Sequence, residues 1–328
     1  MAVIEVVDLV KEYVIAKKKS GLRGSIKGLF FPKKTTIRGV DGISFAIQRG
    51  EIVGYIGPNG AGKSTTIKML TGIIHPTVGA IRVCGINPQD NRKAVVKRLG
   101  VVFGQRTQLY WDLRLGESFE LLRRIYQIDQ VTYDENLQLL TDVLKLSEIM
   151  DTPVRQLSLG QRMRGDLAAA MLHSPEVLFL DEPTIGLDAE AKHAIRSFIL
   201  EINRSRGVTV ILTTHDLDDV EQLCSKLIVV NHGKIVEDGP IQAIVGKLAP
   251  KRLLVVELQH LGDDLSHPSA TIIKQEGLKI WYQFEKTEIT ASELISDLSR
   301  KLSIQDLSVQ EPDIEDAIRE VYKTTAGI

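Results

Sequence analysis

The residues from Gly57 to Ser64 have the spacing of a phosphate-binding loop, G-x-x-x-x-G-K-[ST]. An apolar run, IVGYIG, leads into this stretch, and a helical pattern, KSTTIKMLTGI, follows it. Glycines let backbone N–H groups curl around a phosphate, and the start of a helix adds a favourable dipole. Lys63 is expected to reach the β- and γ-phosphates, and Ser64 to bind Mg²⁺. The predicted nucleotide contacts are Gly57, Pro58, Asn59, Gly60, Ala61, Gly62, Lys63, Ser64 and Thr65.

Two further apolar runs end in residues that could complete such a site. VLFLDE covers residues 177–182, and VTVILTTH covers residues 208–215. Continuous apolar runs are typical of parallel strands covered on both faces, and ligands bind at the carboxyl ends of such strands. Asp181 is therefore expected to hold Mg²⁺, and Glu182 to orient or deprotonate an attacking water. His215 is expected to contact the γ-phosphate.

A second stretch also suits an anion. LSLGQRMRGD, residues 157–166, places Ser158 and Gly160 at the predicted start of a helix. Free N–H groups and a serine hydroxyl at a helix N-terminus favour a phosphate. The chain has only one predicted set of Mg²⁺ ligands, so a second complete nucleotide site within the same chain would lack ligands for its metal. The stretch therefore favours a site completed between two molecules.

The elements that must position these groups follow from the surrounding patterns. Residues 3–8 and 43–56 read as strands, and the pattern of residues 106–173 is mostly helical, as in SFELLRRIY. Beyond residue 245, short strands alternate with helices, and the last helix is expected to begin near Asp313. The predicted fold is α/β, with a mostly parallel core sheet, an antiparallel β part and an inserted helical subdomain of about residues 106–173. Residues 1–245 would form this domain, and residues 246–328 a small accessory α+β domain.

Composition sets broad limits on the function. The chain has 328 residues, of which 43% are hydrophobic and 25% charged, with a formal net charge of −1. These values are ordinary for a globular protein and indicate no general attraction to nucleic acid or membrane. Cys84 and Cys224 have no metal-binding spacing. Without a long apolar run or a signal-peptide pattern, the chain is expected in the cytoplasm.

The order of the motifs along the chain resembles that of the nucleotide-binding subunit of an ABC transporter. The motifs that carry this resemblance are GPNGAGKS, Gln105, LSLGQ, VLFLDEP, the GLD of residues 186–188 and His215. The resemblance covers residues 3–245 and implies a P-loop NTPase fold, ATP and Mg²⁺ as cofactors, and ATP hydrolysis. It implies that Tyr13 stacks on adenine and that Gln105 links Mg²⁺ and the attacking water to the membrane-subunit contact. Taken alone, Tyr13 could be a core residue, Gln105 a surface residue and Asp188 a helix cap.

The resemblance also explains the second phosphate-directed stretch. In this family two ATPase subunits pack head to tail, and the phosphate loop of one faces the signature segment of the other, here residues 157–161. The positions implied to act on the partner's nucleotide are Ser158, Gly160, Gln161 and Asp188. A homodimer is expected, at the cytoplasmic face of the membrane and attached to separate permease subunits.

Residues 101–122, VVFGQRTQLYWDLRLGESFELL, carry a narrower resemblance to efflux-type ATPases related to sodium-export and drug-resistance subunits. It implies export. An importer-type ATPase is the nearest alternative, because its motifs are nearly the same. A DNA-repair or chromosome-organising ATPase is disfavoured because no heptads occur. A translation factor of this type is disfavoured because the chain has one phosphate loop and one signature segment.

Two surface predictions remain. Leu109, Tyr110 and Trp111 follow Gln105, and we expect them either to receive a helix of the membrane subunit or to lie in the core of the helical subdomain. Residues 17–38 contain eight Lys or Arg and no acid. They could form a solvated loop or contact anionic lipid headgroups. Nucleic acid is not expected, because no binding motif accompanies them.

Overall fold

The computed structural model describes residues 2–17, 33–104, 106–248, 251–260, 264–285, 287–310 and Ile318. Most of the basic stretch and the expected last helix near Asp313 therefore lie outside the described residues. The chain forms two compact units, Met1–Gly239 and Pro240–Ile328. Among the described residues, no helix combines the length and the apolar character needed to span a membrane.

A six-stranded sheet forms the centre of the first unit, with strand order β5-β6-β7-β3-β8-β9. Its strands are β3 (Ile52–Ile56), β5 (Leu99–Phe103), β6 (Val177–Asp181), β7 (Thr209–Thr213), β8 (Lys226–Asn231) and β9 (Lys234–Pro240). The pairs from β5 to β8 are parallel. Every residue of β3 and β7 is buried, as continuous apolar runs predict. The mostly parallel α/β core is confirmed.

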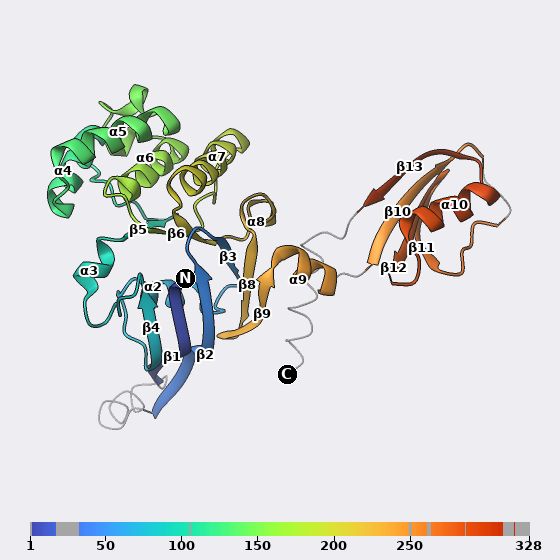
Figure 1. Ribbon diagram of the computed structural model, residues 1–328, viewed down its shortest axis with the longest axis horizontal. Helices are drawn as coiled ribbons and strands as arrows, with labels where there is room; N and C mark the ends of the chain where they lie inside the picture. Colours follow the sequence, from blue (N-terminus) through green and yellow to red (C-terminus); the bar gives the residue numbers. More distant parts are fainter. Residues whose placement is uncertain are drawn as a thin grey trace, which may run out of the picture. The chain divides into compact units, whose positions relative to one another are not determined.

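A second, antiparallel sheet has the order β2-β1-β4 and comprises β1 (Ala2–Lys17), β2 (Lys33–Gln48) and β4 (Val78–Val83). Helix α2 (Lys63–Leu70) lies beside this sheet (Figure 1) and buries Ile67, Met69 and Leu70. Side chains of both sheets and of α2 belong to one apolar cluster. The start of α2, where the phosphate loop ends, is thereby fixed to the core.

A group of helices follows β5 and lies at the end of the unit away from β1, β2 and β4 (Figure 1). It consists of α4 (Leu115–Tyr126), α5 (Gln130–Leu144), η1 (Ser147–Ile149), η2 (Val154–Gln156) and α6 (Leu159–Met171). Asp129 begins α5 by accepting a hydrogen bond from the Thr132 N–H. Three further helices flank the sheet: α3 (Arg92–Val96), α7 (Ala189–Arg206) and α8 (Leu217–Leu223).

The second unit is α+β. It begins with α9 (Ile241–Leu248) and contains an antiparallel sheet of order β11-β12-β10-β13. The strands are β10 (Lys251–Leu258), β11 (Ala270–Glu276), β12 (Lys279–Glu285) and β13 (Ile304–Gln310). Helix α10 (Ala291–Lys301) contributes Leu294 and Leu298 to the same apolar cluster as Val256 and Tyr282 of the sheet.

Candidate nucleotide site

The phosphate loop joins the end of β3 to the start of α2, and its close backbone contacts require glycine. A Cβ at Gly57 would lie 2.3 Å from the carbonyl oxygen of Val230. A Cβ at Gly62 would lie 2.4 Å from the carbonyl oxygen of Gly39, and Gly62 has a φ of 104°. The loop lines a cleft of about 180 Å³ with Gly39, Pro58, Asn59, Gly60, Gly62, Lys63, Ser64, Thr65 and Glu182.

Lys63 closes the loop on itself. Its Nζ donates to the carbonyl oxygens of Gly57 at 2.6 Å and Pro58 at 3.3 Å. Burial lowers the pKa of Lys63, while the nearby carboxylates of Glu182 and Asp181 act in the opposite direction. A phosphate in the cleft would offer this ammonium a charged acceptor in place of two neutral carbonyls.

Asp181, at the end of β6, faces the start of α2. The Ser64 hydroxyl donates to its Oδ2 at 3.3 Å, and the Thr213 hydroxyl donates to its Oδ1 at 2.5 Å. The residues present fit Mg²⁺, since this ion prefers hard oxygen ligands and is commonly held by one or two side chains together with phosphates. Gln105, the third predicted ligand, lies outside the described residues.

Glu182 and His215 meet across the ends of β6 and β7. The Nε2 of His215 lies 2.6 Å from the Oε1 of Glu182. Glu182 has a φ of 56°, and its N–H donates to the carbonyl oxygen of Thr213 at 2.9 Å. Gly104 packs against the same turn, because a Cβ there would lie 2.1 Å from the carbonyl oxygen of Glu182. The backbone around Glu182 is thus held from two sides.

Tyr13 lies beside the phosphate loop. Its side chain is exposed, and its hydroxyl lies 3.4 Å from the Thr65 Oγ1. The ring passes close to Gly39, where a Cβ would lie 2.9 Å from the Tyr13 Cε2. Tyr13 is therefore not a core residue, and the Lys11 Nζ lies 5.5 Å from the centre of its ring.

The signature residues lie together at the start of α6. Ser158 is the N-cap: the Gln161 N–H donates to its Oγ at 3.2 Å, and the Ser158 N–H donates to the Gln161 Oε1 at 2.9 Å. The serine oxygen accepts in this arrangement, which leaves the hydroxyl proton for another acceptor.

Asp188 is indeed a helix cap, because its Oδ1 accepts from the Ala191 N–H at 2.8 Å at the start of α7. Ser158, Gly160, Gln161 and Asp188 line one hollow of about 360 Å³, and none of the residues around the phosphate-loop cleft lines it. The structure thus brings the predicted site residues into two separate groups.

The segment after Gln105 divides between core and surface. Leu109 is buried, whereas Tyr110 and Trp111 are exposed. The Arg162 guanidinium lies 5.7 Å from the centre of the Trp111 ring. Of the two alternatives, placement in the core of the helical subdomain therefore holds for Leu109, which packs against α6, where a Cβ at Gly165 would lie 3.0 Å from its Cδ1.

The sequence patterns did not identify two buried acids, Asp166 and Asp219. Asp166 of α6 accepts at Oδ1 from the Thr107 hydroxyl and the Gln108 N–H, both at 2.9 Å, and burial raises its pKa to about 6. Asp219 of α8 is fully buried. The position of Asp166 on the apolar face of α6, three residues after Met163 and four before Ala170, is a signal that could have identified it.

A phosphate loop between a strand and a helix, next to a strand that ends at Asp181 and is followed by Glu182, defines a P-loop NTPase. The comparisons identify its family: the model of the ABC transporter family matches residues 40–185. The Nod factor export ATP-binding protein I of Ralstonia nicotianae is 37% identical over 227 residues, which cover 69% of this chain and 68% of that protein. The ATP-binding protein NatA of Bacillus subtilis is 30% identical over 215 residues, covering 66% of this chain and 87% of NatA.

Solved structures agree. The ATP-binding subunit of an ABC transporter superposes with a TM-score of 0.63 at 27% identity, covering 75% of this chain and 92% of that one. A dimeric ATP-binding cassette bound to ADP and Pi has a TM-score of 0.60 and covers 72% of this chain and 98% of that one. Because the two sequences are only 23% identical, this similarity shows the common fold alone. The chain belongs to the ATP-binding proteins of the ABC transporter family, and it is an ATP-hydrolysing subunit of a transporter.

Proposed function

We propose that this chain powers export and hydrolyses ATP at sites that two copies complete for each other. The observation that carries the proposal is the separation of the two groups of residues. One phosphate loop occupies one cleft, while Ser158, Gly160, Gln161 and Asp188 line a different hollow. Similarity to the Nod factor export protein supports the export direction.

Within one copy, we assign the groups as follows. Lys63 and the loop N–H groups bind the β- and γ-phosphates, and Tyr13 stacks on the adenine. Ser64, Asp181 and Gln105 hold Mg²⁺, which supplies positive charge next to the phosphates. Glu182 takes up the proton of the attacking water, and His215, at 2.6 Å, orients Glu182 and contacts the γ-phosphate.

The partner copy contributes the second group. In the proposed head-to-tail dimer, the Ser158 hydroxyl and the N–H groups at the start of α6 meet the γ-phosphate bound by the other copy. Asp188 crosses the interface from the start of α7. Loss of the γ-phosphate on hydrolysis removes this bridge, so that the dimer opens.

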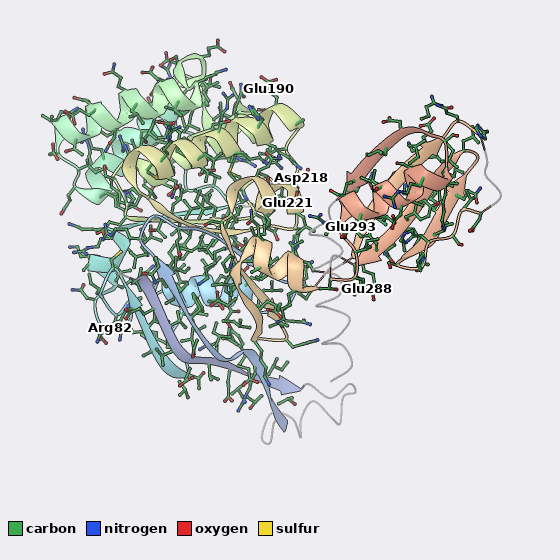
Figure 2. The ribbon with its side chains drawn as sticks, turned by 45° about the vertical axis from the view of Figure 1, so that its right-hand side comes forward. Arg82, Glu190, Asp218, Glu221, Glu288 and Glu293 are labelled. Atoms are coloured by element: carbon green, nitrogen blue, oxygen red, sulfur yellow. The ribbon has the colours of Figure 1, made fainter. Side chains whose placement is uncertain are left out.

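A Glu182→Gln variant tests the assignment. It should bind ATP and remain dimeric with ATP, while its hydrolysis rate falls by roughly 10² to 10⁴. Glu221→Gln on α8 is the matched control, because Glu221 is exposed (Figure 2) and should leave the rate unchanged. Wild-type turnover in Glu182→Gln would refute the role of Glu182.

We further propose that residues 1–245 form the ATPase domain, with a helical subdomain of about residues 106–173, and that residues 246–328 form an accessory domain. The change from one compact unit to the next after Gly239 supports this division. The chain would act at the cytoplasmic face of a membrane, bound to permease subunits through the segment after Gln105. A solute-binding protein that copurifies with the membrane complex would instead indicate an importer.

The basic stretch of residues 17–38 is proposed to contact anionic lipid headgroups near the permease. Its charge composition supports this proposal. Charge reversal at Lys17, Lys18 and Lys19 should weaken binding to vesicles that contain anionic lipid. Equal binding by the variant and the wild type would remove the lipid contact.

A further inference from the structure

A buried carboxylate lies behind the Glu182–His215 pair. Asp219 of α8 is fully buried, although its neighbours Asp218 and Glu221 on the same short helix are exposed (Figure 2). A buried carboxylate is costly unless charged or polar donors surround it. The donors that Asp219 finds therefore indicate what it does.

Two of these donors are threonine hydroxyls from the loops that carry the proposed catalytic groups. The Thr184 hydroxyl donates to the Asp219 Oδ2. The Thr214 hydroxyl donates to the same oxygen at 3.2 Å. Both threonines are themselves buried.

Their places in the chain are informative. Thr184 follows Glu182 by two residues, after β6, and Thr214 directly precedes His215, after β7. One carboxylate oxygen thus joins the two loops whose side chains must meet at 2.6 Å. Removing these two hydrogen bonds would let the two loops move apart, while the phosphate loop would stay intact.

The other carboxylate oxygen is bound to α7. The Arg196 Nε donates to the Asp219 Oδ1 at 2.6 Å, and the side chain of Arg196 is only 12% exposed. A parallel contact joins Lys192, one turn earlier in α7, to Asp216 at 2.5 Å. Helix α7 begins directly after Asp188, so that both contacts fix the helix that presents Asp188.

We propose that Asp219 is a positioning residue, which holds Glu182 and His215 at hydrogen-bond distance and ties that geometry to the helix carrying Asp188. When Asp188 contacts the partner copy, the position of α7 changes the geometry of the Glu182–His215 pair, because Arg196 of α7 is bound to Asp219. This inference rests on the proposed function, in which Asp188 meets the second copy.

Pairs of near-isosteric variants in the full-length chain test the role. Thr214→Val removes the hydroxyl and keeps the shape, whereas Thr214→Ser keeps the hydroxyl. Thr184→Val and Thr184→Ser form a second pair. Asp219→Asn weakens all three contacts, and the exposed Asp218→Asn on the same helix is its control.

The valine variants and Asp219→Asn should lose about tenfold or more in kcat for ATP, because small misplacements of catalytic groups are costly. KM for Mg·ATP and ATP-dependent dimerisation should stay at wild-type values, and the serine variants and Asp218→Asn should keep wild-type kcat. Should Asp219→Asn fail to fold, the two threonine pairs decide the question.

The proposal is overturned if valine and serine variants turn over alike, or if KM changes while kcat does not. Glu182→Gln separates this failure from a failure of the site. If Glu182→Gln stops turnover while Thr214→Val hydrolyses at the wild-type rate, the positioning role alone is wrong. If Glu182→Gln itself turns over normally, the site on which the inference rests is wrong.

Discussion

The Nε2 of His215 lies 2.6 Å from the Oε1 of Glu182, so that the residues following the two strands β6 and β7 meet in a single close contact. The side chain of Glu182 is held by this contact on one side of the cleft, while Lys63 lies on the phosphate-loop side. The orientation of the proposed base therefore depends on a residue from another strand.

His215→Ala should consequently lower kcat by about 10² or more, because Glu182 loses its orienting partner and the γ-phosphate loses a contact. ATP binding to the isolated subunit should change little, since Lys63 and the loop remain. Steady-state hydrolysis and equilibrium ATP binding measure the two effects. His193→Ala, at an exposed position of α7, is the control. A parallel loss of ATP affinity and rate would contradict an orienting role.

Mixing two inactive variants tests whether the sites form between copies. In a dimer of Lys63→Ala and Ser158→Ala chains, one site combines the intact Lys63 of one copy with the intact Ser158 of the other. Such mixtures should regain hydrolysis that neither variant shows alone, whereas sites contained within one copy would gain nothing on mixing. Ser158→Ala also removes an N-cap worth about 1 kcal/mol, so that thermal melting must accompany the assay.

A site residue can be predicted from the sequence when its neighbours in the chain form a recognisable strand or helix start. The phosphate loop, Asp181, Glu182 and His215 follow strand-like runs, and the parallel sheet brings the ends of those runs together. The helix-opening pattern of LSLGQ correctly places Ser158 at the start of α6. In each case the neighbouring residues determine the position.

The buried network behind the site could not be predicted in that way. Asp219, Thr184 and Arg196 come from three elements, and their contacts depend on the packing of α7 and α8 against the sheet. Leu109 illustrates the same limit. It stands next to two exposed aromatic residues in the sequence, but the close approach of α6 at Gly165 buries it.

Asp166 should make the stability of the chain depend on pH. Burial raises its pKa to about 6 in the folded chain from an ordinary value of 3.8. Between these values the folded chain binds more protons than the unfolded chain, so the contribution of Asp166 to the free energy of unfolding falls as pH rises and is lowest above pH 6. The change amounts to roughly 3 kcal/mol.

Urea unfolding of wild type and Asp166→Asn between pH 4 and pH 7.5 measures this contribution. The free energy of unfolding of the wild type should fall, relative to that of the variant, as pH rises through this range. The exposed Asp151→Asn provides the control. A difference between wild type and Asp166→Asn that does not vary with pH would show that Asp166 is not the group responsible.

Trp111 and Leu109 should respond differently to substitution. Trp111→Ala should leave the free energy of unfolding nearly unchanged and weaken assembly with the permease subunits, because an exposed tryptophan suits an interface anchor. Leu109→Ala should lower the free energy of unfolding by about 2–5 kcal/mol, because it empties a buried position. Thermal melting and copurification from membranes measure the two effects. General unfolding of Trp111→Ala would place its ring in the core instead.

Gly104 imposes a different kind of constraint. It has no side chain, yet a single methyl group there would lie 2.1 Å from the carbonyl oxygen of Glu182. Its N–H also donates to the carbonyl oxygen of Asp181 at 2.7 Å. Any side chain at position 104 would therefore clash with the backbone of Glu182. If all amino acids are tested at this position, only glycine should support ATP hydrolysis. A position that carries no chemical group would thus rank with Lys63 and Glu182 in mutational sensitivity.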